Sequence, residues 1–141
     1  MKRVLFICTH NSSRNQMAEE WVNHDMAGKM QAFSAGTDST FVHPLAVAVM
    51  KDLGIVISRQ RSKSLDEFGD GKFDFVITLC DHAAESCPVF FGGTQRMYMG
   101  FPDPSAITGT EEEKLLFFRK LRDQTRKEIM KFCPRSNDKS H

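Results

Sequence analysis

Residues 3–28 contain a short apolar run, a polar loop and an amphipathic segment in direct succession. The run Arg3 to Ile7 (RVLFI) is typical of a strand buried inside a parallel sheet, and it leads into a polar loop that begins at Cys8. From Arg14 to Gly28 the apolar residues recur at helical spacing, which indicates an amphipathic helix that ends at a glycine. A strand joined to a helix by so short a loop favours an α/β fold.

The rest of the chain repeats this alternation of strand and helix. Further strands are predicted at residues 30–35, 73–79 and 95–99, and further helices at 44–54 and from Thr110 to Pro134. Pro44 marks one helix start, and Thr110 and Glu113 have the spacing of a capping box. The alternation predicts an α/β fold with a small doubly wound parallel sheet of about four strands, flanked by helices on both faces.

The length and the composition limit the organisation of the chain. A chain of 141 residues with 40% hydrophobic residues fits a single domain over 1–141, with a disordered polar tail at 134–141. Its net charge of +1, with both signs mixed along the chain, argues against nucleic acid or an anionic membrane as partner. No apolar run is long enough to cross a bilayer and the start is too short for a signal peptide, so we expect a cytoplasmic protein. We also expect it to be a monomer.

The loop from Cys8 to Arg14 has the pattern Cys-x5-Arg between a strand and a helix. Such a loop points backbone N–H groups inward at the positive end of the helix dipole, which makes a cradle for an anion. The Arg14 guanidinium suits a tetrahedral oxyanion, and the same field stabilises the reactive thiolate of Cys8. The predicted oxyanion-binding residues are Thr9, His10, Asn11, Ser12, Ser13, Arg14 and Asn15. The alternative is a structural Cys8 before an ordinary helix with a surface Arg14.

Three segments with reactive side chains each follow a predicted strand. They begin at Cys8, at Cys80 and at the turn 101–104, and the carboxyl ends of parallel strands lie at one edge of a sheet. We therefore expect the three segments to meet. Asp103, bounded by two prolines, would then act as the general acid for a leaving oxygen, although Asp in a proline turn is also common for structural reasons.

Cys80 and Cys87 form the only closely spaced cysteine pair among the four cysteines of the chain. On a helix their sulfurs would share one face but lie about 10 Å apart, too far for a disulfide unless the segment rearranges. The alternatives are a metal site using Cys80, His82 and Cys87, or two unconnected buried thiols. Metal sites usually pair cysteines at shorter spacing, so we expect no metal. Cys133 is interpreted as an incidental thiol.

Four stretches of the chain together resemble a known family: VLFICTHNSSRNQMAEEW, SAG at 34–36, FDFVITLCDHAAESCP and FPDPS. They are similar to the thioredoxin-coupled arsenate reductases built on the low-molecular-weight protein tyrosine phosphatase fold. The resemblance implies that Cys8 is the nucleophile, that Arg14 and the loop amides bind the oxyanion, and that Asp103 is the acid. It also implies that Cys80 and Cys87 pass reducing equivalents to an external dithiol protein, thioredoxin, with no cofactor, and that phosphate or sulfate competes with arsenate.

Three features depart from the pattern of that superfamily. Some of these reductases bind a cation through an acidic residue in the loop after the second helix, whereas the stretch from Arg59 to Lys63 is basic here, so we expect no cation dependence. Asn15 stands where a serine commonly donates a hydrogen bond to the thiolate, and its amide can donate instead. Ser105 stands where phosphatases often have a tyrosine that holds an aromatic substrate, which weakens the phosphatase interpretation. Three function classes follow: an arsenate reductase first, a low-molecular-weight phosphatase second, and a non-catalytic thiol redox sensor or metal-binding protein third.

Overall fold

The four strands of the structure form one parallel sheet in the order β2-β1-β3-β4. They are β1 (Lys2–His10), β2 (Met30–Asp38), β3 (Phe73–Thr78) and β4 (Gly93–Tyr98). This computed structural model describes residues 2–10, 13–38, 42–57, 63, 72–79, 93–101, 104 and 107–138, and only the backbone at 9–10, 37–38, 93–96 and 132–138. The predicted parallel α/β sheet of about four strands is therefore confirmed.

The direction of the strand order reverses at β1. From β1 the chain moves outward to β2 on one side, and it later returns to place β3 and β4 on the other side. Open parallel sheets bind their ligands at such a switch point, beyond the carboxyl ends of the strands. The fold thus places Cys8, near the carboxyl end of β1, where a ligand site is expected.

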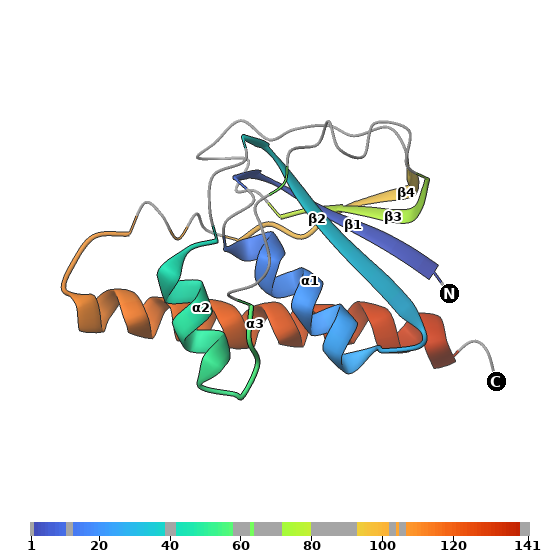
Figure 1. Ribbon diagram of the computed structural model, residues 1–141. Coiled ribbons are helices and arrows are strands. Elements are labelled where there is room, and N and C mark those ends of the chain that lie inside the picture. The colour runs from blue at the N-terminus through green and yellow to red at the C-terminus, as the bar shows by residue number, and fades with distance from the viewer. Residues whose placement is uncertain are drawn as a thin grey trace.

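The three described helices are α1 (Arg14–Asp25), α2 (Pro44–Lys51) and α3 (Glu111–Asp138). They lie on the same side of the sheet (Figure 1), so the predicted helices on its second face are not among the described elements. The sequence signals at their ends are confirmed: Pro44 is the first residue of α2, and Thr110 and Glu113 form the capping box of α3. None of the helices in the described part of the chain combines the length and apolar character of a membrane span.

Side chains of β1 alternate between the two faces of the sheet. Val4 and Phe6 belong to the main core that also contains α1, α2 and α3, whereas Leu5 and Ile7 belong to a smaller cluster with Phe73 and Val76. By the same two-residue period Cys8 shares the helix-facing side with Phe6, and its side chain is fully buried. The nucleophile expected from the sequence therefore lies on the side of the sheet that α1 covers.

Helix α3 packs against α1 through the only tryptophan of the chain. Trp21 is fully buried, and its indole Nε1 donates a hydrogen bond to the carbonyl of Arg122 at 3.1 Å. The Arg126 guanidinium lies 4.3 Å from the centre of the indole ring and pairs with Asp25 at 2.9 Å. A cation over the face of a tryptophan and a paired carboxylate hold this helix contact together.

Several predicted boundaries were wrong, among them the end of the second strand, which runs to Asp38, the end of the second helix, which stops at Lys51, and both ends of the last strand. The ends of the first strand and of the last helix also differ. The first strand does not end at Ile7 but continues to His10, because β2 continues beside it and pairs Cys8 with Gly36 and His10 with Asp38. The last helix does not end at Pro134 but runs to Asp138. A proline removes one backbone donor and bends a helix without always ending it, which is why the prediction stopped too early.

Candidate active site

The described parts of the three expected segments meet beside the end of β1. The backbone N–H of Leu79 donates to the carbonyl of Ile7 at 2.9 Å, and the N–H of Phe101 donates to the carbonyl of Leu79 at 3.1 Å. Ile7 and Leu79 directly precede Cys8 and Cys80, and Phe101 lies two residues before Asp103. The predicted convergence of the three strand ends is confirmed for these described residues.

Arg14 begins α1, and its side chain is buried, with 2% of the residue exposed. Its Nη1 donates a hydrogen bond to the carbonyl of Phe101 at 3.2 Å. Taking a guanidinium out of water is costly unless its donors find acceptors, so a buried arginine indicates a site that needs its charge. The alternative of a surface Arg14 before an ordinary helix is therefore wrong, and the contact ties the start of α1 to the segment that leads to Asp103.

The N-terminus of α1 is not closed by its own capping residue. Ser13 is 4% exposed and makes no side-chain capping hydrogen bond, although its carbonyl accepts from the Met17 N–H at 3.0 Å. The first turn of α1 carries no acidic side chain. Helix N-termini leave several backbone N–H groups without helical partners and carry a partial positive charge. This end of α1 has the polarity of an anion-binding site.

Asn15 lies one residue further along α1 and is fully buried. Its Nδ2 donates to the carbonyl of Ala35 at 2.8 Å, while its Oδ1 has no hydrogen-bond partner among the described residues. Ala35 precedes Gly36, which pairs with Cys8 across the two strands. The amide of Asn15 was expected to donate to the thiolate, and in the structure one of its N–H groups is used by the carbonyl of Ala35 on β2.

The other predicted site residues are only partly described. Thr9 and His10 belong to the backbone of β1 rather than to a loop that begins at Cys8. Asn11, Ser12, Cys80, Cys87 and Asp103 lie outside the described residues, as do His82 of the alternative metal site and Ser105. Within the described part of the chain no three His, Cys, Asp or Glu side chains form a cluster suited to a metal ion.

A polar cluster between α1 and β2 was not predicted from the sequence. Glu19 accepts a hydrogen bond from the Ser34 hydroxyl at 2.6 Å, and the Lys63 ammonium lies 3.6 Å from the same carboxylate. The N–H of Gly36 donates to the Lys63 carbonyl at 2.9 Å. The helical spacing of Asn15 and Glu19 was a signal for a shared face of α1, but nothing in the sequence indicated that Lys63 would reach it.

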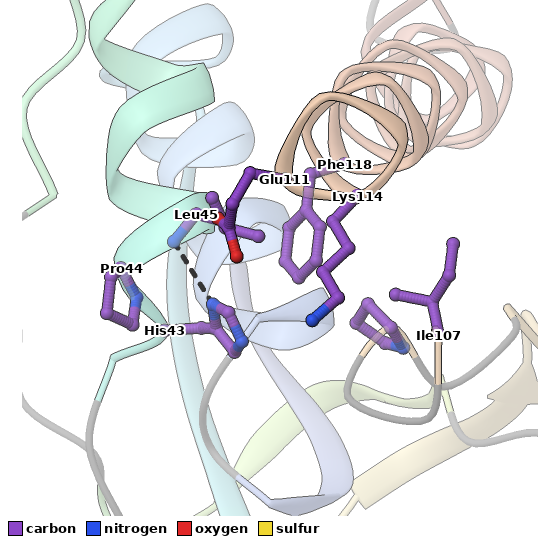
Figure 2. Close-up of a pocket in the computed structure, with 8 residues that line it drawn as sticks. His43, Pro44, Leu45, Ile107, Glu111, Lys114 and Phe118 are labelled. Carbon is purple, nitrogen blue, oxygen red and sulfur yellow. Dashed lines mark hydrogen bonds between the residues drawn. The ribbon is translucent and has the colours of Figure 1, made fainter. Parts of the chain in front are cut away.

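A pocket of about 270 Å³ opens between the N-termini of α2 and α3 (Figure 2). Its wall includes Pro104, the residue after Asp103, so the pocket adjoins the turn of the predicted acid. The Nδ1 of His43 accepts a hydrogen bond from the Leu45 N–H at 3.1 Å, and the ring packs 4.8 Å from that of Phe118. Burial, helped by the positive charge of Lys114, lowers the pKa of His43, which favours the neutral ring that this cap requires.

Comparison with known proteins assigns the family. The model of the low molecular weight phosphotyrosine protein phosphatase family matches residues 3–140. The chain therefore belongs to this family. Its relatives include an arsenate reductase of Halalkalibacterium halodurans, which is 43% identical over 132 residues, covering 94% of this chain and 95% of that protein.

Solved structures agree with this assignment. An arsenate reductase in the phosphate binding state superimposes with a TM-score of 0.77 at 31% identity, over 96% of this chain and 98% of that one. A thioredoxin-dependent arsenate reductase of Corynebacterium glutamicum superimposes with a TM-score of 0.59 at 26% identity, over 92% of this chain and 62% of that one. The predicted resemblance to arsenate reductases of the phosphatase fold is confirmed, as is the expectation of an enzyme of this kind.

Proposed function

We propose that this chain is a single catalytic domain that reduces arsenate to arsenite and is regenerated by thioredoxin. One observation carries the proposal: a fully buried cysteine thiol and a buried arginine stand at the switch point of the sheet, in a chain 43% identical to an arsenate reductase. We also expect the protein to be a cytoplasmic monomer without a cofactor, its electrons coming from the external dithiol. Phosphate and sulfate are proposed to compete with arsenate, since charge and tetrahedral geometry are what the cradle recognises.

The first chemical step joins arsenate to the enzyme. The Cys8 thiolate attacks arsenic, a sulfur–arsenic bond forms, and one arsenic–oxygen bond breaks as Asp103 gives its proton to the leaving oxygen, which departs as water. Arg14 and the N–H groups at the start of α1 balance the negative charge on the remaining oxygens. The product is a covalent thiol–arsenate ester on Cys8, with arsenic still in its oxidised form.

The second step reduces arsenic. The Cys80 thiolate attacks the Cys8 sulfur, so a Cys8–Cys80 disulfide forms and the electron pair of the sulfur–arsenic bond leaves with arsenic as arsenite. Two thiol sulfurs are oxidised while arsenic gains two electrons. The segment that leads to Cys80 supports this step, because Leu79 is hydrogen-bonded to Ile7, the residue before Cys8.

The third step moves the disulfide outward. Cys87 attacks Cys80 and forms a Cys80–Cys87 disulfide, which frees Cys8, provided that the segment between them rearranges enough to bring the sulfurs together. Thioredoxin then reduces this disulfide and is itself oxidised. The thioredoxin-dependent relative from Corynebacterium glutamicum supports this choice of reductant.

Phosphate ester hydrolysis is the second candidate, favoured by the family model that matches residues 3–140. A phosphate ester would form the corresponding intermediate on Cys8, and water rather than Cys80 would then release the phosphate. This reaction needs Cys8, Arg14 and Asp103 but neither Cys80 nor Cys87. A non-catalytic redox sensor, the third class, would need a thiol pair and no Asp103.

The deciding experiment measures arsenite formation with thioredoxin, thioredoxin reductase and NADPH, beside aryl phosphate hydrolysis by the same protein. We expect multiple turnovers of arsenate and weak phosphate ester hydrolysis. Cys87→Ser should release one equivalent of arsenite and then stall, whereas Cys80→Ser should release none. Cys133→Ser is the matched control and should turn over normally.

Hydrolysis of the aryl phosphate should survive in both relay variants. Sustained arsenate turnover by Cys87→Ser would contradict the relay and indicate direct reduction of a Cys8–Cys80 disulfide. Phosphate ester hydrolysis without any arsenite from the wild-type protein would favour the phosphatase instead.

A further inference from the structure

Three consecutive residues of β2 are each held by one polar contact from outside the sheet. The hydroxyl of Ser34 donates to Glu19, the carbonyl of Ala35 accepts from Asn15, and the N–H of Gly36 donates to the carbonyl of Lys63. These residues run beside β1 in register with Phe6, Ile7 and Cys8. The contacts therefore fix the backbone that lies directly against the nucleophile.

Lys63 makes two of the contacts in this cluster. Its carbonyl receives the N–H of Gly36, and its ammonium lies 3.6 Å from the Glu19 carboxylate. Only 13% of the Lys63 side chain and 15% of the Glu19 side chain are exposed. The ion pair of Arg119 and Asp52 is a contrast, with 45% and 43% of the side chains exposed.

Burying a lysine and a glutamate together gains little stability over an apolar pair of similar size, because both charges lose their hydration. A buried pair is therefore better explained by what its charges do locally than by its contribution to folding. Loss of one member is different, since it removes an opposite charge from a partner that stays largely out of water.

The charge of Glu19 lies close enough to matter for Cys8. Ser34 and Gly36 are two residues apart on a strand, and Gly36 faces Cys8 across one strand spacing, which places the carboxylate roughly 10 Å from the thiol. At that distance a carboxylate that has lost its lysine counter-charge would disfavour both a thiolate and an arsenate anion.

We infer that Lys63 is a positioning residue for the reaction: it holds Gly36 opposite Cys8 and supplies the counter-charge that keeps Glu19 from opposing the thiolate and the oxyanion. The inference rests on the proposed role of Cys8 as the nucleophile. It assigns to Lys63 a role that neither the Cys-x5-Arg pattern nor the cysteine pair indicates.

The two members of the pair should have opposite effects when each is neutralised. In full-length protein with Cys80, Cys87 and Cys133 changed to serine, the thiolate of Cys8 is titrated by its ultraviolet absorbance, and binding of inorganic phosphate is measured by calorimetry. Lys63→Met should move the thiolate midpoint to higher pH and weaken phosphate binding about tenfold. Glu19→Gln should move the midpoint to lower pH and strengthen phosphate binding. The double variant should return close to the parent protein.

Lys131→Met is the matched control, since Lys131 forms an exposed ion pair with Glu128 on α3 at 3.1 Å. It should change neither measurement. In the otherwise unchanged protein, Lys63→Met should raise the KM for arsenate more than it lowers kcat, and Lys63→Arg should restore most of the loss.

A purely structural pair would lower the melting temperature of both single variants without opposite shifts in the midpoint, and that result would overturn the inference. If Lys63→Met does not fold, Glu19→Gln and the double variant still test the inference. An unchanged thiolate midpoint in Glu19→Gln would contradict it. The titration and the phosphate binding do not depend on arsenate turnover. If the two variants shift the thiolate midpoint in opposite directions but the wild-type protein makes no arsenite, the role of Lys63 stands and the proposed reductase activity is wrong.

Discussion

At the N-terminus of α3, Thr110 and Glu113 satisfy each other's backbone N–H groups at 3.0 and 3.1 Å, and the first turn carries three glutamates. At the N-terminus of α1 the comparable residues are Ser13 and Gln16, which have the spacing of the same motif, yet Ser13 makes no capping hydrogen bond. The first end is exposed and acidic, whereas the second is buried and begins with an arginine.

The difference shows how the same local motif serves two purposes. Side chains close the N-terminus of α3, so that end is complete without a ligand. The N-terminus of α1 keeps its partial positive charge and adds Arg14, which is the polarity expected of the proposed oxyanion site. A capping pattern in the sequence therefore predicts a helix start. It does not indicate whether side chains or a ligand will accept hydrogen bonds from the first N–H groups of the helix.

Arg14→Gln should have the largest effect, because it removes the buried charge that distinguishes the start of α1. We expect kcat/KM for arsenate to fall about a thousandfold, in the range seen when one essential charge-stabilising group is removed from an active site. Steady-state kinetics with the thioredoxin system measure this. Arg119→Gln, which removes an exposed guanidinium from α3, is the control and should retain the wild-type value. A loss of less than about tenfold in Arg14→Gln would contradict the oxyanion role.

Gln16→Glu tests whether the missing acid at the start of α1 matters. The change gives α1 the Ser-x-x-Glu pattern of a closed end and places a negative charge beside the cradle. We expect the KM for arsenate and the inhibition constant of phosphate to rise together, by about tenfold. The reverse exchange on α3, Glu113→Gln, should leave both constants unchanged. Unchanged constants in Gln16→Glu would mean that the oxyanion binds away from this helix end.

Thr110→Ala should break the closed end without touching the chemistry. The loss of this cap should cost about 1 kcal/mol of stability and lower the melting temperature by roughly 3 °C. Thermal unfolding followed by circular dichroism measures the shift, and arsenate kinetics at 25 °C should not change, to within about twofold. A Thr110→Ala protein with much weaker arsenate turnover would show that the two helix ends are coupled.

The smallest effect concerns the pH dependence of the α3 cap. Hydrogen bonds from the backbone and side chain of Thr110 hold the pKa of Glu113 below the usual value for a glutamate. Because the folded pKa is the lower one, the contribution of Glu113 is complete above the unfolded pKa and is lost as the pH falls through the folded pKa. The difference in melting temperature between wild type and Glu113→Gln should therefore shrink as the pH is lowered from 7 into the acid range. A difference that stays constant in acid would contradict this linkage.

Most of the fold was predictable because local signals and burial point the same way. The apolar runs in β1 and β3, Pro44 at the start of α2 and the capping box of α3 all matched the structure. The end of β1 was not predictable, because it depends on pairing with a strand about thirty residues away rather than on the polar loop sequence. The end of α3 was missed because a proline weakens a helix locally while long-range packing decides where it stops.

The residues of the candidate site differ in how far the sequence alone could predict them. Cys8 and Arg14 carry a local pattern whose meaning follows from the strand and helix on either side. Lys63 carries none, because its contacts with Glu19 and Gly36 exist only once distant segments have packed. Asn15 is intermediate: its place after Arg14 marked it as part of the site, but its bond to Ala35 depends on the docking of α1 against β2.

The packing of α3 against α1 has an optical consequence. Trp21 is the only tryptophan in the chain, so all indole fluorescence comes from a single ring that water does not reach. That ring is covered by the Arg126 guanidinium and bonded to the Arg122 carbonyl, both on α3. The tryptophan emission therefore reports on the contact between α1 and α3 alone. Separation of α3 from α1 exposes the indole and shifts its emission to the red, so the protein carries its own spectroscopic probe for the docking of α1, the helix that begins at Arg14.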